Sequence, residues 1–159
     1  MLHRPCFMRV NLWRMKSFKL AVKNFDLEKT LGSGQVFHWE KLGSGFCGTI
    51  GDHAVYVEQR DAELRVVMED EVPQRPGEKL EGMPRPTSAT ATRELVRHYF
   101  ALDHPLEEIC RSFPQDPVMD AARLFCRGLR IIRQPKWECL ATFICSSMKQ
   151  VSHIRQISH

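Results

Sequence analysis

The sequence predicts an α+β fold, because the spacing of its apolar residues changes once along the chain. Between residues 16 and 70, apolar residues recur at every second position, which is typical of strands with one buried face. After residue 90 they recur at three- and four-residue spacing, which is typical of amphipathic helices. The 159 residues suffice for one ordinary domain, or for a small domain and the start of a second.

The composition is that of a folded protein. Hydrophobic residues make up 43% of the chain and charged residues 26%, which argues against wholesale disorder. The net charge of +4 is compatible with a polyanionic partner but does not by itself identify one.

The chain begins with a basic segment, residues 1–15, which we expect to be a disordered leader. Six basic residues precede the first acidic residue, Asp26; they are Arg4, Arg9, Arg14, Lys16, Lys19 and Lys23. The segment lacks the apolar run of a secretory signal or a membrane span, so we expect no membrane partner. A mitochondrial presequence is the alternative, and translation that begins at Met15 would leave the segment out.

The first domain, predicted over residues 16–113, begins with a β meander in which neighbouring strands pair. The apolar residues with strand spacing are Phe18, Leu20 and Val22, then Phe37 and Trp39, then Val55 and Val57, then Leu64, Val66 and Met68. Short turn signals separate the strands at Gly43-Ser44-Gly45, Gly51-Asp52 and Asp61-Ala62-Glu63. A proline-rich, mobile linker is predicted over 69–90, with Pro73, Pro76, Pro84 and Pro86.

Three short helices are predicted after the linker. Their apolar faces are Leu95, Val96, Tyr99 and Phe100, then Leu106, Ile109, Cys110 and Phe113, then Val118, Ala122, Phe125 and Leu129. Pro105 and Pro117 suit a first helical turn, Asp116 suits an N-cap and Gly128 suits a helix end.

Residues 114–159 are predicted to begin a second, helical domain that is cut short. A fourth helix should begin near Pro135 and bury one face, formed by Trp137, Leu140, Ala141 and Ile144. Ser147 and Gln150 have the spacing of a capping box, so another helix should begin there. It would run to His159 without a stop signal, and we therefore expect a truncated chain.

We predict no catalytic constellation, metal site or cofactor site within this chain. The cysteines lack CxxC spacing and an export signal, so we expect free thiols, with Cys110, Cys126 and Cys139 buried as small hydrophobes. The candidate acid–base residues are scattered, and we expect structural roles for His38, Glu40, His53, Glu58 and His98. A glycine-rich phosphate loop is also lacking, so nucleotide hydrolysis is not supported.

Two segments resemble the 8-oxoguanine DNA glycosylase family. Residues 31–39 contain Ser33-Gly34-Gln35-Val36-Phe37-His38-Trp39, which is similar to that family's Ser-Gly-Gln-x-Phe-x-Trp turn. Residues 131–147 are similar to its helix with Arg-Gln, Glu-Cys-Leu and Phe-Ile-Cys-Ser-Ser. The resemblance covers roughly residues 17 to 159. It implies a twisted antiparallel sheet with helices on one face, a TBP-like N-terminal domain, followed by the first helices of an α-helical glycosylase domain.

The resemblance implies part of a base excision repair enzyme that removes 8-oxoguanine and cleaves the abasic site. Its partner would be double-stranded DNA containing oxidised guanine, and the protein would be a monomer in the bacterial cytoplasm or the eukaryotic nucleus. The family's lysine nucleophile and its aspartate would follow His159, so we expect the chain alone to be inactive. The alternatives are a free-standing, non-catalytic DNA-binding module and a non-functional relic with exposed apolar surface.

The resemblance implies a lesion-base pocket that includes Gly34, Cys139 and Phe143. Gly34 matches the glycine whose carbonyl accepts the N7 hydrogen that only oxidised guanine carries, and glycine permits so close a backbone approach. Phe143 matches an aromatic that packs on the flipped base, although a place in the core is an equal alternative. Cys139 matches another pocket neighbour, but we expect it in the core.

The resemblance also implies contacts to DNA and to the opposite base after the two serines. The residues at these places are Met148, Lys149, Gln150, His153 and Arg155. The first four depart from the family's asparagines and arginine, so the opposite-base preference is left open, with Met148 as a candidate wedge. Arg155 is a candidate phosphate contact, and a solvated helix face is the alternative for Lys149 and His153.

Overall fold

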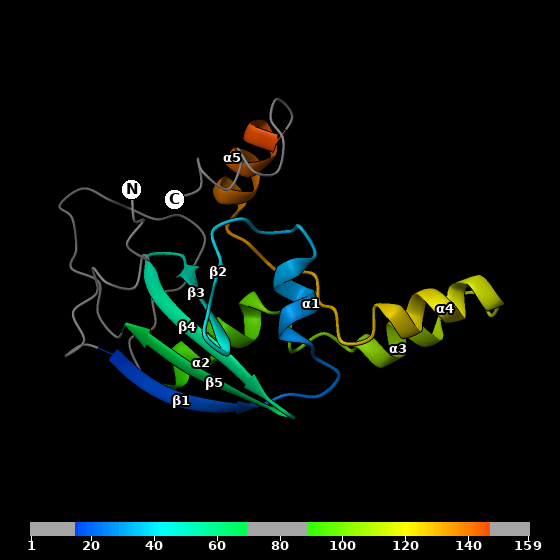
Figure 1. Ribbon diagram of the computed structural model, residues 1–159, viewed down its shortest axis with the longest axis horizontal. Coiled ribbons are helices and arrows are strands. Elements are labelled where there is room, and N and C mark those ends of the chain that lie inside the picture. Colours follow the sequence, from blue (N-terminus) through cyan, green and yellow to red (C-terminus); the bar gives the residue numbers. More distant parts are fainter. Residues whose placement is uncertain (1–14, 70–88, 147–159) are drawn as a thin grey trace.

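The computed structural model describes residues 15–69 and 89–146, which form an antiparallel sheet with helices around it (Figure 1). The five strands lie in the spatial order β1-β5-β4-β3-β2. Their bounds are Met15–Ala21 (β1), Glu40–Leu42 (β2), Gly45–Ile50 (β3), His53–Arg60 (β4) and Glu63–Glu69 (β5). The predicted α+β class is confirmed.

The strands β2 to β5 form the predicted meander, in which each strand pairs with the next. The expected pairing of β1 with its sequence neighbour β2 is wrong, because β1 pairs with β5 at the opposite edge of the sheet, from Met15↔Glu69 to Ala21↔Glu63. The helix α1 (Leu27–Gly32) follows β1 and lies between the two strands in sequence.

The helix α1 was not predicted, because its six residues are too few for a clear apolar period. Its first turn is held by polar side chains instead. The Asp26 carboxylate caps it by accepting the Lys29 N–H at 2.9 Å. From β4, Gln59 accepts the Leu27 N–H at 2.7 Å through Oε1 and donates through Nε2 to the Phe25 carbonyl at 2.8 Å.

The core lies between the sheet and α2 (Ala89–Tyr99). Of the strand residues predicted to face inward, Val55, Val57, Leu64 and Val66 are fully buried, whereas Phe18 is only partly buried. From the helical side come the predicted apolar residues Leu95, Val96, Tyr99 and Phe100. The apolar side chains predicted from strand alternation and those predicted from helical spacing thus pack together in one layer.

Phe37 and Trp39 were predicted to lie in a strand, but both precede β2 in irregular backbone. The reason is the place of the Trp39 indole, which packs over Gly48 of β3 and donates to the Tyr99 hydroxyl at 2.9 Å. The contacts of Trp39 with Gly48 and Tyr99, and not the alternation of a strand, therefore determine where its side chain lies.

The predicted helices are present as α3 (Leu106–Arg111), α4 (Pro117–Phe125) and α5 (Lys136–Ser146). Asp116 caps α4 as predicted, accepting from the N–H groups of Val118 and Met119 at 2.9 Å each, and Pro117 follows in the first turn. Pro105 is the N-cap of α3 and not part of its first turn.

The expected burial of the α5 face is wrong. Trp137, Leu140 and Ile144 are 73%, 49% and 56% exposed. Cys126 and Cys139, expected to be buried, are exposed, and Cys110 is half-buried. The helices α3, α4 and α5 extend away from the sheet (Figure 1), and no described element covers these apolar side chains.

Several predictions lie outside the described residues: the leader up to residue 14, the linker from 70 to 88, and the segment 147–159 with its capping box. Met15, predicted to belong to the leader, begins β1. At the linker's edges, β5 runs to Glu69 and α2 begins at Ala89. The domain boundary at residue 113 stays a prediction.

In the described parts of the chain, every helix is too short or too polar to cross a membrane.

Candidate functional site

The turn after α1 exposes a glycine with left-handed backbone. Gly34 has a φ of 85°, which side-chain-bearing residues rarely adopt, and a Cβ placed on it would meet no atom within 4 Å. The glycine is therefore required by the backbone and not by crowding. The space beside it is open, so another molecule can approach the peptide closely.

Two glutamines join this turn to the extended segment 130–135, which leads into α5. The Gln35 Oε1 accepts the Ile132 N–H at 2.8 Å, and its Nε2 donates to the Arg130 carbonyl at 2.9 Å and to the Ser33 Oγ at 2.8 Å. In return, the Gln134 Nε2 donates to the Gln35 carbonyl at 2.6 Å. The two segments that carry the family resemblance therefore lie side by side.

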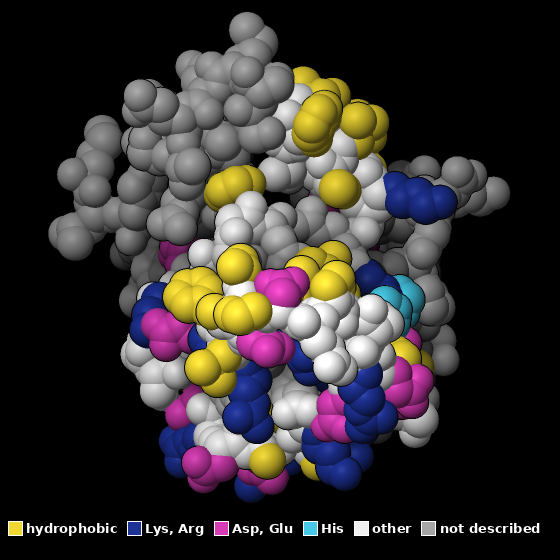
Figure 2. All heavy atoms as spheres, turned by 90° about the vertical axis from the view of Figure 1, so that its right-hand side faces the viewer, with side chains coloured by type: hydrophobic (Ala, Val, Ile, Leu, Met, Phe, Trp, Pro, Cys, Tyr) yellow, Lys and Arg dark blue, Asp and Glu magenta, His cyan; other side chains and the backbone are white. Residues whose placement is uncertain are grey.

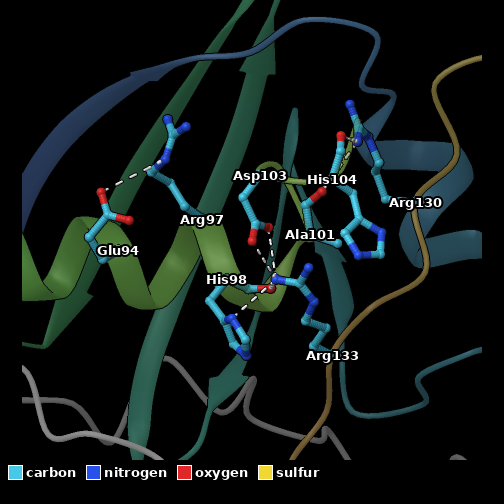
Figure 3. A network of polar contacts seen from close by, with 8 residues as sticks. All are labelled: Glu94, Arg97, His98, Ala101, Asp103, His104, Arg130 and Arg133. Carbon is cyan, nitrogen blue, oxygen red and sulfur yellow. Dashed lines mark hydrogen bonds and ion pairs between the residues drawn. The ribbon is translucent and has the colours of Figure 1, made fainter. Parts of the chain in front are cut away.

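Arg130 anchors the extended segment to the loop after β1 and to the loop after α2. Figure 3 shows its contacts with Ala101 and His104 in the second of these loops. The side chain is buried and donates only to backbone carbonyls: those of Ala101 and His104 through Nη1, at 3.2 and 2.8 Å, that of Lys23 through Nη2 at 3.1 Å, and that of Asn24 through Nε at 3.3 Å. Burial lowers the pKa of Arg130, but an arginine keeps its proton in proteins.

Arg133 fixes the same segment to the end of α2. Its N–H donates to the Tyr99 carbonyl at 2.9 Å, and its Nη1 donates to the two Asp103 carboxylate oxygens at 2.7 and 2.9 Å (Figure 3). This hydrogen bond lowers the pKa of Asp103. The same Nη1 lies 3.1 Å from the His98 Nδ1. A cation at a helix C-terminus is favourable, because the last carbonyls carry negative partial charge.

An aromatic cluster supports the other end of the turn segment. The Tyr99 hydroxyl accepts from the Trp39 indole, and the His38 Nε2 lies 3.4 Å from that hydroxyl. The same His38 nitrogen lies 3.2 Å from the Thr49 carbonyl, which can only accept, so a hydrogen bond between them requires the tautomer with the proton on Nε2. Burial raises the pKa of Tyr99. These contacts hold His38 against Tyr99 and β3, and its structural role stays a prediction.

The first turn of α5 carries a carboxylate in an unfavourable place. The Glu138 Oε2 is buried and has no hydrogen-bond partner in the described parts of the chain. Burial raises the pKa of Glu138, and the nearby negative charge of Asp52 raises it further. Further along α5, Cys139 is exposed and Phe143 is 69% exposed.

The structure brings some of the predicted site residues together and leaves others undescribed. Gly34 lies in the turn that is bonded to the segment before α5, and Cys139 and Phe143 lie on α5 itself. The expectation of a core position is wrong for Cys139, and Phe143 is not a core residue either. Pocket roles for all three stay predictions. The remaining predicted residues, Met148, Lys149, Gln150, His153 and Arg155, lie outside the described residues.

Four residues of this site had no predicted role: Gln35, Gln134, Arg130 and Arg133. The hydrogen bonds join residues almost a hundred positions apart, so no local pattern in the sequence could reveal them. The only signal available was that Gln35, Gln134 and Arg133 fall within the two segments that carry the family resemblance. Within residues 15–69 and 89–146, no group of three or more His, Cys, Asp or Glu side chains could hold a metal ion.

Comparisons with known proteins agree on one family. The sequence profile described as "8-oxoguanine DNA glycosylase, N-terminal domain" matches residues 17–140. The N-glycosylase/DNA lyase OGG1 of Arabidopsis thaliana is 28% identical over 141 residues, which are 87% of this chain and 35% of that protein.

Solved structures of similar proteins share the fold. MBOgg1, in complex with a low affinity DNA ligand, superposes with a TM-score of 0.69 at 26% identity, over 87% of this chain and 43% of that one. The apo-form of the Clostridium acetobutylicum 8-oxoguanine glycosylase/lyase gives a TM-score of 0.68 at 23% identity, with the same coverage. The chain spans less than half the length of each of these relatives.

Proposed function

Because the chain belongs to the family of 8-oxoguanine DNA glycosylase N-terminal domains, we propose that it supplies damaged-DNA binding and part of the lesion pocket of a DNA repair glycosylase with abasic-site lyase activity. Its partner is double-stranded DNA that contains oxidised guanine. The enzyme of which it forms part acts as a monomer without a metal ion, in the cytoplasm of a bacterium or the nucleus of a eukaryote.

One observation carries the proposal: the exposed Gly34 turn is hydrogen-bonded to the segment that begins α5. An enzyme that extrudes a base needs polar groups that read its edge and an apolar surface that packs on its face. The open peptide at Gly34 can supply the first, and the exposed ring of Phe143 can supply the second. Discrimination is strong when the wrong base leaves a buried polar group unpaired.

The relatives favour an enzyme over a free-standing binding module. The Arabidopsis protein is named as both N-glycosylase and DNA lyase, and MBOgg1 was solved with a DNA ligand. The lysine nucleophile and the aspartate implied by the resemblance would follow residue 159. We therefore assign binding and pocket formation to this chain, and base removal to the enzyme of which it forms part.

The test is a comparison of two duplexes that differ in one base, with 8-oxoguanine or guanine opposite cytosine. We expect the chain to bind the lesion duplex about fivefold more tightly, which corresponds to roughly 1 kcal/mol. Phe143→Ala should reduce this preference, whereas Phe125→Ala, which removes another exposed phenylalanine on α4, should not. Equal affinity of the wild-type chain for both duplexes would contradict the proposal.

Borohydride trapping checks where the nucleophile lies. A lysine that attacks the sugar forms a Schiff base, which borohydride reduces to a stable protein–DNA adduct. We expect no adduct from the 159-residue chain with the lesion duplex. An adduct would place the nucleophile among the chain's own amines and overturn the division of roles.

A further inference from the structure

We propose that Gln35 and Gln134 are positioning residues that set the Gly34 turn against the start of α5. The two residues are called the glutamine clamp below. The inference rests on the proposed function, in which the Gly34 turn and α5 form the two sides of the lesion pocket. The clamp would hold the Gly34 peptide in its binding orientation before DNA arrives.

The Gln35 carboxamide matches the backbone of the extended segment as a neighbouring strand would. It accepts from the N–H of Ile132 and donates to the carbonyl of Arg130, two groups that point to the same side of an extended chain. A third bond, to the Ser33 Oγ, uses the second N–H of the same amide. Only an amide provides an acceptor and two donors in these places.

Gln134 completes the clamp from the opposite segment. Its Nε2 donates to the Gln35 carbonyl at 2.6 Å, so Gln35 is held at its side chain and at its backbone. The Gly34 carbonyl is covalently attached to the Gln35 nitrogen. Fixing Gln35 on both sides therefore restricts rotation of the Gly34–Gln35 peptide, which glycine by itself would leave free.

The tip of this turn lies at the surface. Ser33 and Gly34 are exposed, and α1 is held at its other end by the Asp26 cap and by Gln59. A restraint on an exposed turn beside open space reduces the entropy lost when a ligand binds. We therefore expect the clamp to act on lesion recognition more than on folding.

The chain provides a matched control in Gln59. Like Gln35, Gln59 uses its amide to bond an N–H and a carbonyl that lie two positions apart in the chain. Its Oε1 accepts from the Leu27 N–H at 2.7 Å, and its Nε2 donates to the carbonyls of Phe25 at 2.8 Å and Asp61 at 3.0 Å. Gln59→Ala thus removes three hydrogen bonds, as Gln35→Ala does, but at the opposite end of α1. Loss of general stability should be similar in the two variants.

The first measurement is the ratio of affinities for duplexes with 8-oxoguanine and with guanine opposite cytosine. We expect Gln35→Ala to lower this ratio about fivefold while the affinity for the undamaged duplex changes less than about twofold. Gln59→Ala should leave the ratio unchanged. Gln35→Glu keeps the size and the acceptor for Ile132 but sets a second oxygen against the Arg130 carbonyl, so it should behave like Gln35→Ala.

The second measurement needs no DNA. In Gln134→Ala, the Ile132 N–H keeps its acceptor on Gln35, so its amide hydrogen exchange reports whether the two glutamines act together. We expect exchange at Ile132 to be faster in Gln134→Ala than in Gln59→Ala and in the wild-type chain.

The outcomes separate the two proposals. A wild-type affinity ratio of one would overturn the proposed function, and the exchange at Ile132 would still decide whether the clamp exists. A wild-type ratio above one that Gln35→Ala retains would overturn the clamp alone, as would equal effects of Gln35→Ala and Gln59→Ala. If Gln35→Ala does not fold, Gln134→Ala, which loses one hydrogen bond, takes its place in the same comparison.

Discussion

Single polar side chains hold together parts of the chain that are distant in sequence. The Arg130 guanidinium donates to carbonyls in the turn after β1 and in the turn after α2. Asn24 and Ala101, two of its acceptors, have left-handed backbone with φ of 46° and 49°. The Ala101 and His104 carbonyls each accept one backbone N–H as well, whereas Arg130 is the donor described for the Lys23 and Asn24 carbonyls. A buried carbonyl without a partner is costly. Arg130 is therefore a central structural residue.

Replacing Arg130 should destabilise the chain strongly. Arg130→Met keeps much of the apolar stem but removes four hydrogen bonds. The Ala101 and His104 carbonyls keep a backbone donor each, whereas the Lys23 and Asn24 carbonyls lose the donor described for them. We therefore expect the free energy of unfolding to fall by about 3 kcal/mol. Urea unfolding measures it. Arg111→Met, at an exposed position with an ion pair to Glu107, should cost about 0.5 kcal/mol or less. Equal losses would show that the guanidinium contacts matter little.

Because the Glu138 carboxyl is buried, we expect the stability of the chain to depend on pH. Burial raises its pKa above the ordinary value of 4.5, so the folded chain favours the neutral carboxyl. The contribution of the neutral Glu138 carboxyl to the free energy of unfolding is complete below the ordinary pKa. It is lost as the pH rises through the raised pKa of the folded state. We therefore expect Glu138→Gln to be more stable than the wild type at pH 7, and this advantage to shrink toward pH 4.

Urea unfolding of both proteins between pH 4 and pH 7 tests this prediction. Glu108→Gln, an exposed change on α3, is the control. An advantage of Glu138→Gln that stays constant across this range would rule out ionisation as its cause.

At the level of elements, β3 depends on a glycine for space. A Cβ on Gly48 would lie 2.5 Å from the Trp39 Cδ2, so the indole could not keep its place or its bond to Tyr99. We expect Gly48→Ala to lower the free energy of unfolding by about 1–3 kcal/mol, as overpacking does. Thermal or urea unfolding measures it.

Gly32 gives the opposite expectation for the same change. It lies in α1, and a Cβ added to it would meet no atom within 4 Å. Alanine is the better helix former, so Gly32→Ala should raise the free energy of unfolding by about 0.5–1 kcal/mol. A loss at Gly32 as large as at Gly48 would mean that backbone freedom, and not space, decides both positions.

For the whole molecule, the main feature is a division between a buried and an uncovered apolar region. The sheet and α2 enclose the core, whereas hydrophobic side chains lie exposed over α3, α4 and α5 (Figure 2). They include Val118, Leu124 and Phe125 on α4, which are 81%, 72% and 81% exposed. Contiguous exposed apolar surface favours association or a partner.

The uncovered helices predict self-association of the isolated chain. We expect its apparent mass in sedimentation to rise with concentration, and the double change Leu124→Glu with Phe125→Glu to shift the chain toward the monomer without loss of the sheet. Ser17→Glu on β1, at an exposed polar position, is the control. Concentration-independent mass of the wild-type chain would contradict the prediction.

The sequence by itself determined the class of fold, most of the elements and the family. Strand alternation, helical spacing and the Asp116 cap act between residues a few positions apart, so they can be recognised without knowing the chain's path. The same holds for the motif around Gly34, whose left-handed backbone the structure displays.

Only the tertiary structure decided how these parts meet. The pairing of β1 with β5, the place of the Trp39 indole, the exposure of Cys139 and the bonds from Gln35 to the segment before α5 were not predicted. Each depends on a partner far away in sequence; Gln35 and Ile132 are 97 positions apart. An apolar or polar pattern states what a residue prefers to contact, but several distant partners satisfy the same preference, and only the packed chain selects one.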